Sequence, residues 1–317
     1  MQTVLIYTEA GTFGLGHIKR QIVLARELQQ RGLSVEFVHP WHEHVGWDIL
    51  HQSGFRVSPS EVELPSADML IVDVEEYPSR DLFLDWRTRY SKVVLFGGAA
   101  YPRFDGENLV DLTVYQGELF DGPSSGHALN GLEYVIVDPA FAACWPSASG
   151  HIVVSMGGRD LYNMTPIALA ALEGIDRRVI CIIGPQFDNL SFKWAQAEIV
   201  QSPASLAPYL DGAALCVCAT GMTAYEALAA GVLVVLGNIS EDHERTAQEL
   251  DRLGVAVNLG QTHEFTAERC AHSIDYFING RIDVWPEISK RACSLIDGHG
   301  VERVSEKVCQ LIIPARS

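Results

Sequence analysis

The stretch Val4-Leu5-Ile6-Tyr7, with Gly14-Leu15-Gly16-His17-Ile18-Lys19-Arg20 behind it, decides the fold of this chain. The apolar run predicts a first strand, and the glycines predict a turn into a helix whose first turn carries three basic side chains. Glycine lets a backbone approach a ligand closely, and the N–H groups at a helix start can bind a polar or anionic group. An imidazole at that point can take up a proton near neutral pH. We therefore expect a ligand site at this turn.

The remaining sequence alternates short apolar runs with helical patterns. Strands are expected at residues 3–7, 35–39, 69–73, 92–96, 112–115, 134–137, 151–155, 179–183, 198–201, 213–218 and 232–236. Helices are expected at residues 18–30, 42–52, 80–90, 166–172, 222–230, 241–253, 267–278, 287–296 and about 301–311. Such alternation is typical of parallel sheets covered by helices on both faces.

A linker is expected at Asp138–Gly150, which holds two prolines and lacks periodicity. The predicted fold class is therefore α/β, with two Rossmann-like domains at residues 1–145 and 146–317. We expect the last helix, at about 301–311, to pack back on the first domain. The ligand is expected between the domains, at the carboxyl ends of their strands.

The composition excludes several classes of protein. The 317 residues carry a formal net charge of −17, which argues against broad binding of nucleic acid or a membrane surface. No stretch reaches the roughly 18 consecutive apolar residues of a membrane span. The sequence enters a strand at once, without the features of a signal peptide, and its seven cysteines are scattered and odd in number. We expect reduced thiols and a cytoplasmic protein; its oligomeric state is left open.

The glycines from Gly11 to Gly16 are spaced G-x-x-G-x-G, which is not the dinucleotide fingerprint G-x-G-x-x-G. The nearest acid at the ribose-binding distance, Glu36, falls inside the expected second strand. The sequence therefore argues against NAD. The alternative is that His17 has only a local structural role, as a polar side chain at the N-terminus of the helix.

A second glycine pair, Gly157-Gly158, follows the first strand of the second half and precedes Asn163. Adjacent glycines at the end of a strand allow a phosphate or a ribose to lie on the backbone. The alternative is a plain turn, with Thr165 as the N-cap of the next helix and Pro166 at its first position.

A third constellation, Thr220-Gly221-Met222-Thr223, opens another expected helix, and Glu226 lies one turn further in. The N–H groups of this helix start suit a diphosphate, and a carboxylate can accept hydrogen bonds from both hydroxyls of a ribose. The alternative is a capping box between Thr223 and Glu226. Taken together, the three constellations favour a nucleotide-diphosphate site.

On these residues the sequence resembles the PseG/SpsG group of UDP-sugar hydrolases, which have a GT-B architecture related to MurG. The resemblance rests on Gly14–Arg20 with Leu24-Ala25 and Gly32, and on a glycine–glycine–aspartate–asparagine–threonine pattern. It also rests on a nucleotide-binding helix and a C-terminal signature. The last three are matched by Met156–Thr165, Gly221–Val232 and Asp297–Arg303.

The resemblance implies cleavage of a UDP-linked amino or deoxy sugar into UDP and a free sugar. His17 would activate water at the anomeric carbon. The residues that it would place around the sugar are Gly14, Gly16, Lys19, Arg20, Asp73, Tyr77, Asp242 and His243. Those that it would place around the nucleotide are Gly157, Gly158, Asn163, Thr220, Gly221, Met222, Thr223 and Glu226. The first domain would then hold the sugar and the second the nucleotide, with no metal and no cofactor.

Two departures from the family pattern affect the sugar side. The family has an Asn-Gln pair where this chain has Asp242-His243, and it usually keeps a tyrosine two residues after the aspartate that corresponds to Asp73. Here Val74-Glu75-Glu76-Tyr77 follows that aspartate. A glycosyltransferase that uses the same UDP site is therefore an alternative function, and a non-catalytic nucleotide-sugar-binding protein is another.

Two further clusters are interpreted as structural. His39, His42 and His44 lack metal-ligand spacing and are expected in a solvated loop, although contact with substrate is an alternative because the loop leaves the end of a strand. Cys216 and Cys218 share one face of an expected strand, but no second pair lies near them in the sequence. Neither cluster predicts a metal site.

Overall fold

The computed structural model describes residues 2–10, 14–59, 64–75, 79–97, 109–117, 128–187, 196–280 and 282–312. The chain forms two compact units. The first comprises Met1–Ile136 together with His299–Ser317, and the second comprises Val137–Gly298. Within the described ranges, no helix is both long and apolar enough to cross a membrane.

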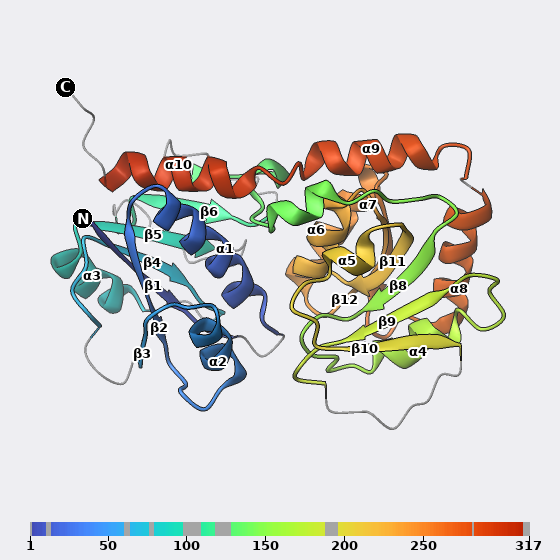
Figure 1. The fold of residues 1–317 in the computed structure, drawn as a ribbon, viewed down its shortest axis with the longest axis horizontal. Helices are drawn as coiled ribbons and strands as arrows, with labels where there is room; N and C mark the ends of the chain where they lie inside the picture. Colours follow the sequence, from blue (N-terminus) through green and yellow to red (C-terminus); the bar gives the residue numbers. More distant parts are fainter. Residues whose placement is uncertain are drawn as a thin grey trace. The chain divides into compact units, whose positions relative to one another are not determined.

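The first unit is built on a parallel sheet of seven described strands in the order β3-β2-β1-β4-β5-β6-β7. Figure 1 labels the strands β1 to β6 of this sheet. The strands are β1 (Thr3–Thr8), β2 (Ser34–His39), β3 (Val57–Pro59), β4 (Met69–Asp73), β5 (Lys92–Gly97), β6 (Leu112–Tyr115) and β7 (Ala128–Leu129). Its described helices are α1 (Gly16–Gln30), α2 (Val45–Gln52), α3 (Arg80–Arg89), the 3₁₀ helix η1 (Leu132–Tyr134) and α10 (Gly300–Ile312).

Side chains alternate between the two faces of this sheet because successive residues of a strand point in opposite directions. Val4 and Ile6 of β1 belong to the core cluster that holds the buried faces of α1 and α10. Leu5 belongs to the opposite cluster, with Phe83 and Trp86 of α3. Burying a large apolar side chain stabilises a fold by about 1.5–3 kcal/mol, so each β1 residue helps to attach one layer of helices.

The helix α10 is more than 160 positions from the nearest other element of the first unit, yet it completes that unit's core. Its residues Val301, Val304 and Val308 are buried in the cluster that contains α1. Arg303 Nη1 also donates a hydrogen bond of 2.9 Å to the carbonyl oxygen of Glu133. The C-terminal segment is therefore an integral part of the first unit.

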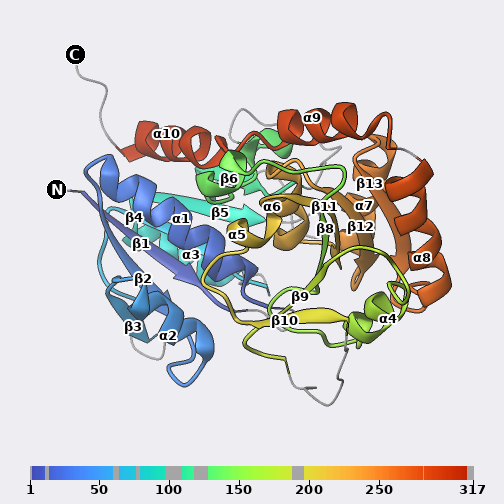
Figure 2. The same cartoon turned by 45° about the vertical axis from the view of Figure 1, so that its right-hand side comes forward.

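The second unit has a parallel sheet of six described strands in the order β10-β9-β8-β11-β12-β13. The strands are β8 (His151–Ser155), β9 (Val179–Ile183), β10 (Ala197–Gln201), β11 (Ala213–Ala219), β12 (Leu233–Asn238) and β13 (Ala256–Gln261). The described helices are η2 (Pro139–Ala143), α4 (Met164–Ala170), α5 (Ala207–Leu210), α6 (Met222–Ala229), α7 (Glu241–Arg252), α8 (Ala267–Asp275), the π-helical turn η3 (Tyr276–Gly280) and α9 (Trp285–Leu295). Figure 2 shows α8 beside β13 at one end of this unit.

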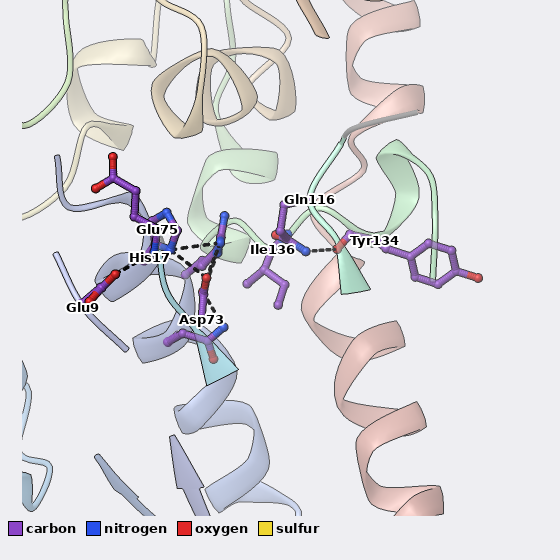
Figure 3. A network of polar contacts seen from close by, with 9 residues as sticks. Glu9, His17, Asp73, Glu75, Gln116, Tyr134 and Ile136 are labelled. Atoms are coloured by element: carbon purple, nitrogen blue, oxygen red, sulfur yellow. Dashed lines mark hydrogen bonds and ion pairs between the residues drawn. The ribbon is translucent and has the colours of Figure 1, made fainter. Parts of the chain in front are cut away.

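Most of the expected elements are present, but the strand predicted at residues 134–137 is wrong. Leu132–Tyr134 is a 3₁₀ turn, and β7 pairs with β6 at the edge of the sheet. The Gln116 side chain meets the backbone that a strand would have paired. Its Nε2 donates to Tyr134 O at 3.1 Å, and its Oε1 accepts from Ile136 N at 3.0 Å (Figure 3). A side chain thus supplies the hydrogen bonds that a neighbouring strand would otherwise provide.

The segment expected as a linker, Asp138–Gly150, is attached to the second unit. Its first half forms η2, and Trp145 N donates to Asp211 Oδ1 at 2.8 Å. Ser147 N donates to Ala213 O at 3.1 Å. Pro and Ser residues therefore mark irregular but hydrogen-bonded backbone here.

Candidate functional site

One face of α1 carries a cluster of polar side chains toward the end of β4. His17, Arg20 and Gln21 lie at positions i, i+3 and i+4, so they share one side of the helix. Asp73 is the last residue of β4 and pairs with Thr8 at the end of the adjacent strand β1. The strand–turn–helix sequence therefore brings all three α1 side chains to one carboxylate.

Asp73 receives hydrogen bonds from each of these three residues, and Figure 3 shows His17 beside it. Its Oδ1 lies 2.8 Å from His17 Nδ1 and also accepts from an Nη atom of Arg20. Its Oδ2 accepts from Arg20 Nε at 2.7 Å and from Gln21 Nε2 at 2.8 Å. The Asp73 side chain is fully buried, whereas His17 is 27 % exposed. The imidazole is thus held from its buried side and accessible from the other.

These contacts determine the charge of Asp73 and the orientation of the imidazole. Burial alone would raise the pKa of this carboxyl, but the Arg20 guanidinium and the His17 imidazole hold its pKa well below the ordinary value. An ionised carboxylate can only accept hydrogen bonds, so we infer that His17 Nδ1 carries the proton. The other ring nitrogen, Nε2, is then an acceptor that can serve as a base.

Other residues predicted around this turn have different placements. Gly14 has a φ of +149°, and Gly16 is the first residue of α1. Lys19 lies two residues after His17 and so falls off the face that meets Asp73. The predicted contact residue Tyr77 lies outside the described residues.

Two acidic residues lie beyond the same strand ends. Glu9 follows β1, and Glu75 lies two residues after the end of β4. Glu75 N donates to Glu9 Oε1 at 2.8 Å (Figure 3). This contact joins the segments that leave β1 and β4, next to the strand that carries Asp73.

In the second unit, the loops after β8, β11 and β12 come together because these strands are neighbours. A Cβ placed on Gly157 would lie 3.9 Å from Thr223 Oγ1, and one placed on Gly221 would lie 3.9 Å from His243 Nε2. The two glycines have φ values of +83° and +144°, which other residues rarely adopt. Two glycine backbones, one hydroxyl and one imidazole therefore gather at one edge of this sheet.

A chain of hydrogen bonds through three side chains supports the same edge. Thr220 Oγ1 donates to Asn238 Oδ1 at 2.7 Å, and Asn238 Nδ2 donates to Asn258 Oδ1 at 2.8 Å. Asn258 Oδ1 also accepts from Gly260 N at 2.9 Å. Because Asn238 is fully buried, this network links the start of α6 to the ends of β12 and β13.

The expected cap of α4 is wrong. The helix begins at Met164, and Asn163 occupies the N-cap position with a left-handed φ of 53°. The Asp160 carboxylate accepts from Met164 N at 2.9 Å and from Thr165 N at 2.7 Å. Thr165 is inside the helix and buried. Since a carboxylate already occupies these two N–H groups, they are not available to bind an anion.

The capping-box alternative for Thr223 and Glu226 is also wrong. The N-cap of α6 is Gly221, and no side chain caps the helix. Thr223 therefore lies in the first turn, and Glu226 is a buried carboxylate in the second. The pKa of the Cys218 thiol is raised, first by its hydrogen bond with Cys216 and by burial. The nearby Glu226 carboxylate makes a smaller contribution in the same direction. A local capping role therefore does not account for this pair.

Asp242 and His243 occupy the first turn of α7, which Ser240 caps by accepting from His243 N at 3.2 Å. Asp242 forms an ion pair of 3.6 Å with Arg245. The two side chains have different surroundings. Of the two, His243 is the one whose ring lies near Gly221 in the loop between β11 and α6.

The expectation of a solvated histidine loop is wrong for His39. Its side chain is fully buried at the end of β2, and its ring stacks on His44 at 5.8 Å between centroids. Burial and the nearby His44 lower the pKa of His39 to about 4. His44 Nδ1 accepts from Gly46 N at 3.1 Å and so caps α2, which begins three residues later than expected. The cluster is thus part of the local structure.

All seven cysteines are free thiols, and Cys181, Cys216, Cys218 and Cys270 are buried. Within the part of the chain that the structure describes, no three His, Cys, Asp or Glu side chains form a group that could hold a metal ion.

Two solved structures show the class of fold. The spinosyn rhamnosyltransferase SpnG in complex with thymidine diphosphate aligns over 97% of this chain and 100% of its own, with a TM-score of 0.68 and 16% identity. MurG from Acinetobacter baumannii aligns over 96% of this chain and 99% of its own, with a TM-score of 0.67 and 14% identity. Together with the two parallel-sheet units, these similarities show a GT-B architecture, as predicted.

One sequence relative matches over nearly the whole chain. The chain is 23% identical to the spore coat polysaccharide biosynthesis protein SpsG of Bacillus subtilis (strain 168), over 92% of this chain and 93% of that protein. No family profile matches the sequence. The predicted resemblance to SpsG-like proteins of GT-B architecture is confirmed.

Gln21, Asn238 and Asn258 belong to the two sites but were not among the predicted residues. Gln21 follows His17 by four residues, and this helical spacing is the signal that could have identified it. The two asparagines are far apart in sequence, and only the pairing of β12 with β13 brings them together. Asp73 and Arg20 are predicted as substrate contacts, and in the structure the two side chains bind each other.

Proposed function

We propose that this protein hydrolyses a UDP-sugar to UDP and a free amino or deoxy sugar. The observation that carries the proposal is the pair formed by His17 and the buried Asp73, whose oxygen lies 2.8 Å from Nδ1. This contact leaves Nε2 as the basic nitrogen on the accessible side of the ring. A base held in this way is suited to deprotonate water during attack on an anomeric carbon.

The proposed reaction needs one proton transfer and one bond exchange. His17 Nε2 takes a proton from water, and the water oxygen forms a bond to the anomeric carbon. The bond from that carbon to the diphosphate oxygen breaks, and its electron pair leaves with UDP. Asp73 stabilises the imidazolium that forms, because its negative charge lies against Nδ1–H.

The second unit would bind the nucleotide. The backbones of Gly157 and Gly221 and the N–H groups at the start of α6 would hold the diphosphate. Thr223 Oγ1 is the hydroxyl nearest to Gly157, and the buried Glu226 carboxylate would accept hydrogen bonds from the ribose. The solved complex of SpnG with thymidine diphosphate supports a nucleoside diphosphate as the ligand class.

A glycosyltransferase is the second candidate, because the structural neighbours include the spinosyn rhamnosyltransferase SpnG and the calicheamicin glycosyltransferase CalG4. The same His17 would then deprotonate an acceptor hydroxyl in place of water. The roles of Asp73 and of the nucleotide residues would not change. The two candidates differ only in the nucleophile.

The purified protein should be incubated with a panel of nucleotide sugars, with and without added acceptors, while NMR follows nucleotide and free sugar. Hydrolysis predicts stoichiometric release of UDP and sugar without an acceptor, and the anomer formed first should be inverted relative to the substrate. A His17→Ala variant should lose about 10²–10⁴-fold in kcat. Unchanged release of UDP by this variant would contradict the role of His17. Release that begins only after an acceptor is added would favour the transferase.

A further inference from the structure

We propose that His243 is a catalytic residue that protonates the departing diphosphate. The inference rests on the proposed function, since it assigns a second histidine to the same bond cleavage, and it concerns residues of the second unit alone. It goes beyond the sequence-based expectation, which places Asp242 and His243 around the sugar.

The position of His243 follows from the order of the strands. β11 and β12 are adjacent, so the start of α6 after β11 and the start of α7 after β12 lie at the same edge of the sheet. Ser240 caps α7 and holds His243 N at 3.2 Å. A Cβ on Gly221 would lie 3.9 Å from His243 Nε2. The imidazole therefore reaches the glycine that is proposed to lie under the diphosphate.

The atom that reaches Gly221 is one that can carry a proton. His243 is half-buried, and its Nδ1 is a buried atom, which leaves Nε2 as the nitrogen directed at the loop. An imidazole can hold a proton near neutral pH and release it to a phosphate oxygen. Gly221 has no side chain that would separate the ring from a ligand on this backbone.

The charges around His243 come mainly from its own helix. Glu241, Asp242 and Glu244 lie in the first turn of α7. Asp242 is paired with Arg245, and Glu244 Oε2 accepts from Gln261 Nε2 at 2.6 Å. The packed strands β12 and β13 carry no ionisable side chain in their ranges, and α6 contributes the buried Glu226. The diphosphate of a bound nucleotide would add a further negative charge next to this imidazole.

The step balances as follows. The bond between the anomeric carbon and the diphosphate oxygen breaks, and the electron pair remains on the phosphate. The proton on His243 Nε2 moves to a β-phosphate oxygen, while water gives a proton to His17 and hydroxide to the carbon. The products are UDP and the free sugar. One histidine has then gained a proton and the other has lost one, and exchange with solvent restores both.

The proposal requires opposite protonation states of the two histidines. The kcat of the wild type should fall at low pH, as His17 becomes protonated, and at high pH, as His243 loses its proton. In His243→Gln the amide retains a hydrogen-bond donor but cannot release a proton. This variant should lose about tenfold to 100-fold in kcat at pH 6.5 and should no longer show the alkaline limb. His272→Gln, on the exposed side of α8, is the matched control and should behave as wild type.

Calorimetry of UDP binding separates this proposal from hydrolysis itself. When the pH is lowered from 8 to 6, the affinity of the wild type for UDP should rise by roughly tenfold more than the affinity of His243→Gln does. UDP binding should also take up more protons in the wild type than in the variant. The difference between the two proteins cancels the titration of the phosphate. Uridine, which lacks a phosphate, should bind both proteins equally.

Each outcome is decisive for one of the two proposals. If UDP binding shows the His243-dependent proton uptake but no nucleotide sugar is hydrolysed, proton donation from His243 to the diphosphate stands and the hydrolase fails. If hydrolysis is observed and His243→Gln retains both its kcat and the alkaline limb, the inference is overturned and the hydrolase stands. A protein that binds no nucleotide overturns both.

Discussion

Replacing Asp73 by Asn tests the central pair of the first unit with little change in shape. Four N–H groups point at the carboxylate, two at each oxygen. An asparagine offers one oxygen and one NH₂ group, so whichever way its amide is turned, two of these donors face another donor. If the oxygen occupies the Oδ1 position, the contacts of Arg20 Nε and Gln21 Nε2 are lost. If it occupies the Oδ2 position, the contacts of His17 Nδ1 and of the Arg20 Nη atom are lost.

The expected loss of stability follows from these contacts. A hydrogen bond to a charged group contributes about 1.5–3 kcal/mol, so two lost contacts correspond to roughly 3–6 kcal/mol. Removing one member of a buried ion pair costs a similar amount, about 3–5 kcal/mol, because the other charge remains. We expect Asp73→Asn to lower the free energy of unfolding by about 3–5 kcal/mol, measured by urea unfolding at pH 7.

The catalytic effect is expected to be of the same size in free energy as the effect on folding, since each tenfold in rate is about 1.4 kcal/mol. The second amide orientation repels Nδ1–H and favours the tautomer in which Nε2 carries the proton, so the base is lost. In the first orientation, the charge that stabilises the imidazolium is lost. A decrease in kcat of about 10²–10⁴-fold is expected, with a smaller change in KM. A Gln21→Ala variant is the matched comparison, since it removes one contact to Asp73 and leaves the carboxylate and His17 in place.

The pH dependence of stability gives an independent check. The pKa of Asp73 is lower in the folded protein than its unfolded value of about 3.8. The stabilisation is therefore complete above this value and is lost as the pH falls through the folded pKa. The gap in stability between wild type and Asp73→Asn should be constant from pH 7 to about pH 4.5 and should narrow below pH 3.8. A kcat for Asp73→Asn within about threefold of wild type, which is less than 0.7 kcal/mol, would refute the reasoning.

Three other predictions follow from the described contacts. Asp160→Ala removes two hydrogen bonds at the start of α4 and should lower the free energy of unfolding by about 0.5–2 kcal/mol in urea unfolding, whereas a Tyr162→Ala control on the exposed part of this loop should cost less. Gly221→Ala forces a side chain onto a φ of +144° and should lower the free energy of unfolding by about 1–3 kcal/mol and weaken UDP binding; unchanged UDP affinity by calorimetry would remove Gly221 from the nucleotide site. His39 has a folded pKa of about 4 against 6.5 unfolded, so wild-type stability should fall as the pH drops from 6.5 to 4, and His39→Gln should lack this component. Parallel pH profiles of the two proteins would contradict the assignment.

The order of elements and the two sheets could be predicted from the sequence, because apolar runs at period two and helical patterns at period 3.6 are local signals. β1, β4, β5 and β6 were expected within one residue of their observed bounds. The short elements β3 and β7 and the edge strand β13 were not expected. Their pairing depends on a neighbouring strand rather than on their own composition. The missing strand at residues 134–137 has the same cause, since the Gln116 side chain meets its hydrogen-bonding groups.

The amino-acid sequence is enough to locate the chemical groups along the chain: glycines and a histidine after β1, and two more glycine loops after β8 and β11. It could not determine which side chains bind one another, because Asp73 is 52–56 positions away from its three partners, and His243 is 22 positions from Gly221. Parallel pairing of β1 with β4 and of β11 with β12 removes these separations. Tertiary structure alone therefore decided that Asp73 orients His17 and that His243 reaches the glycine of the α6 loop.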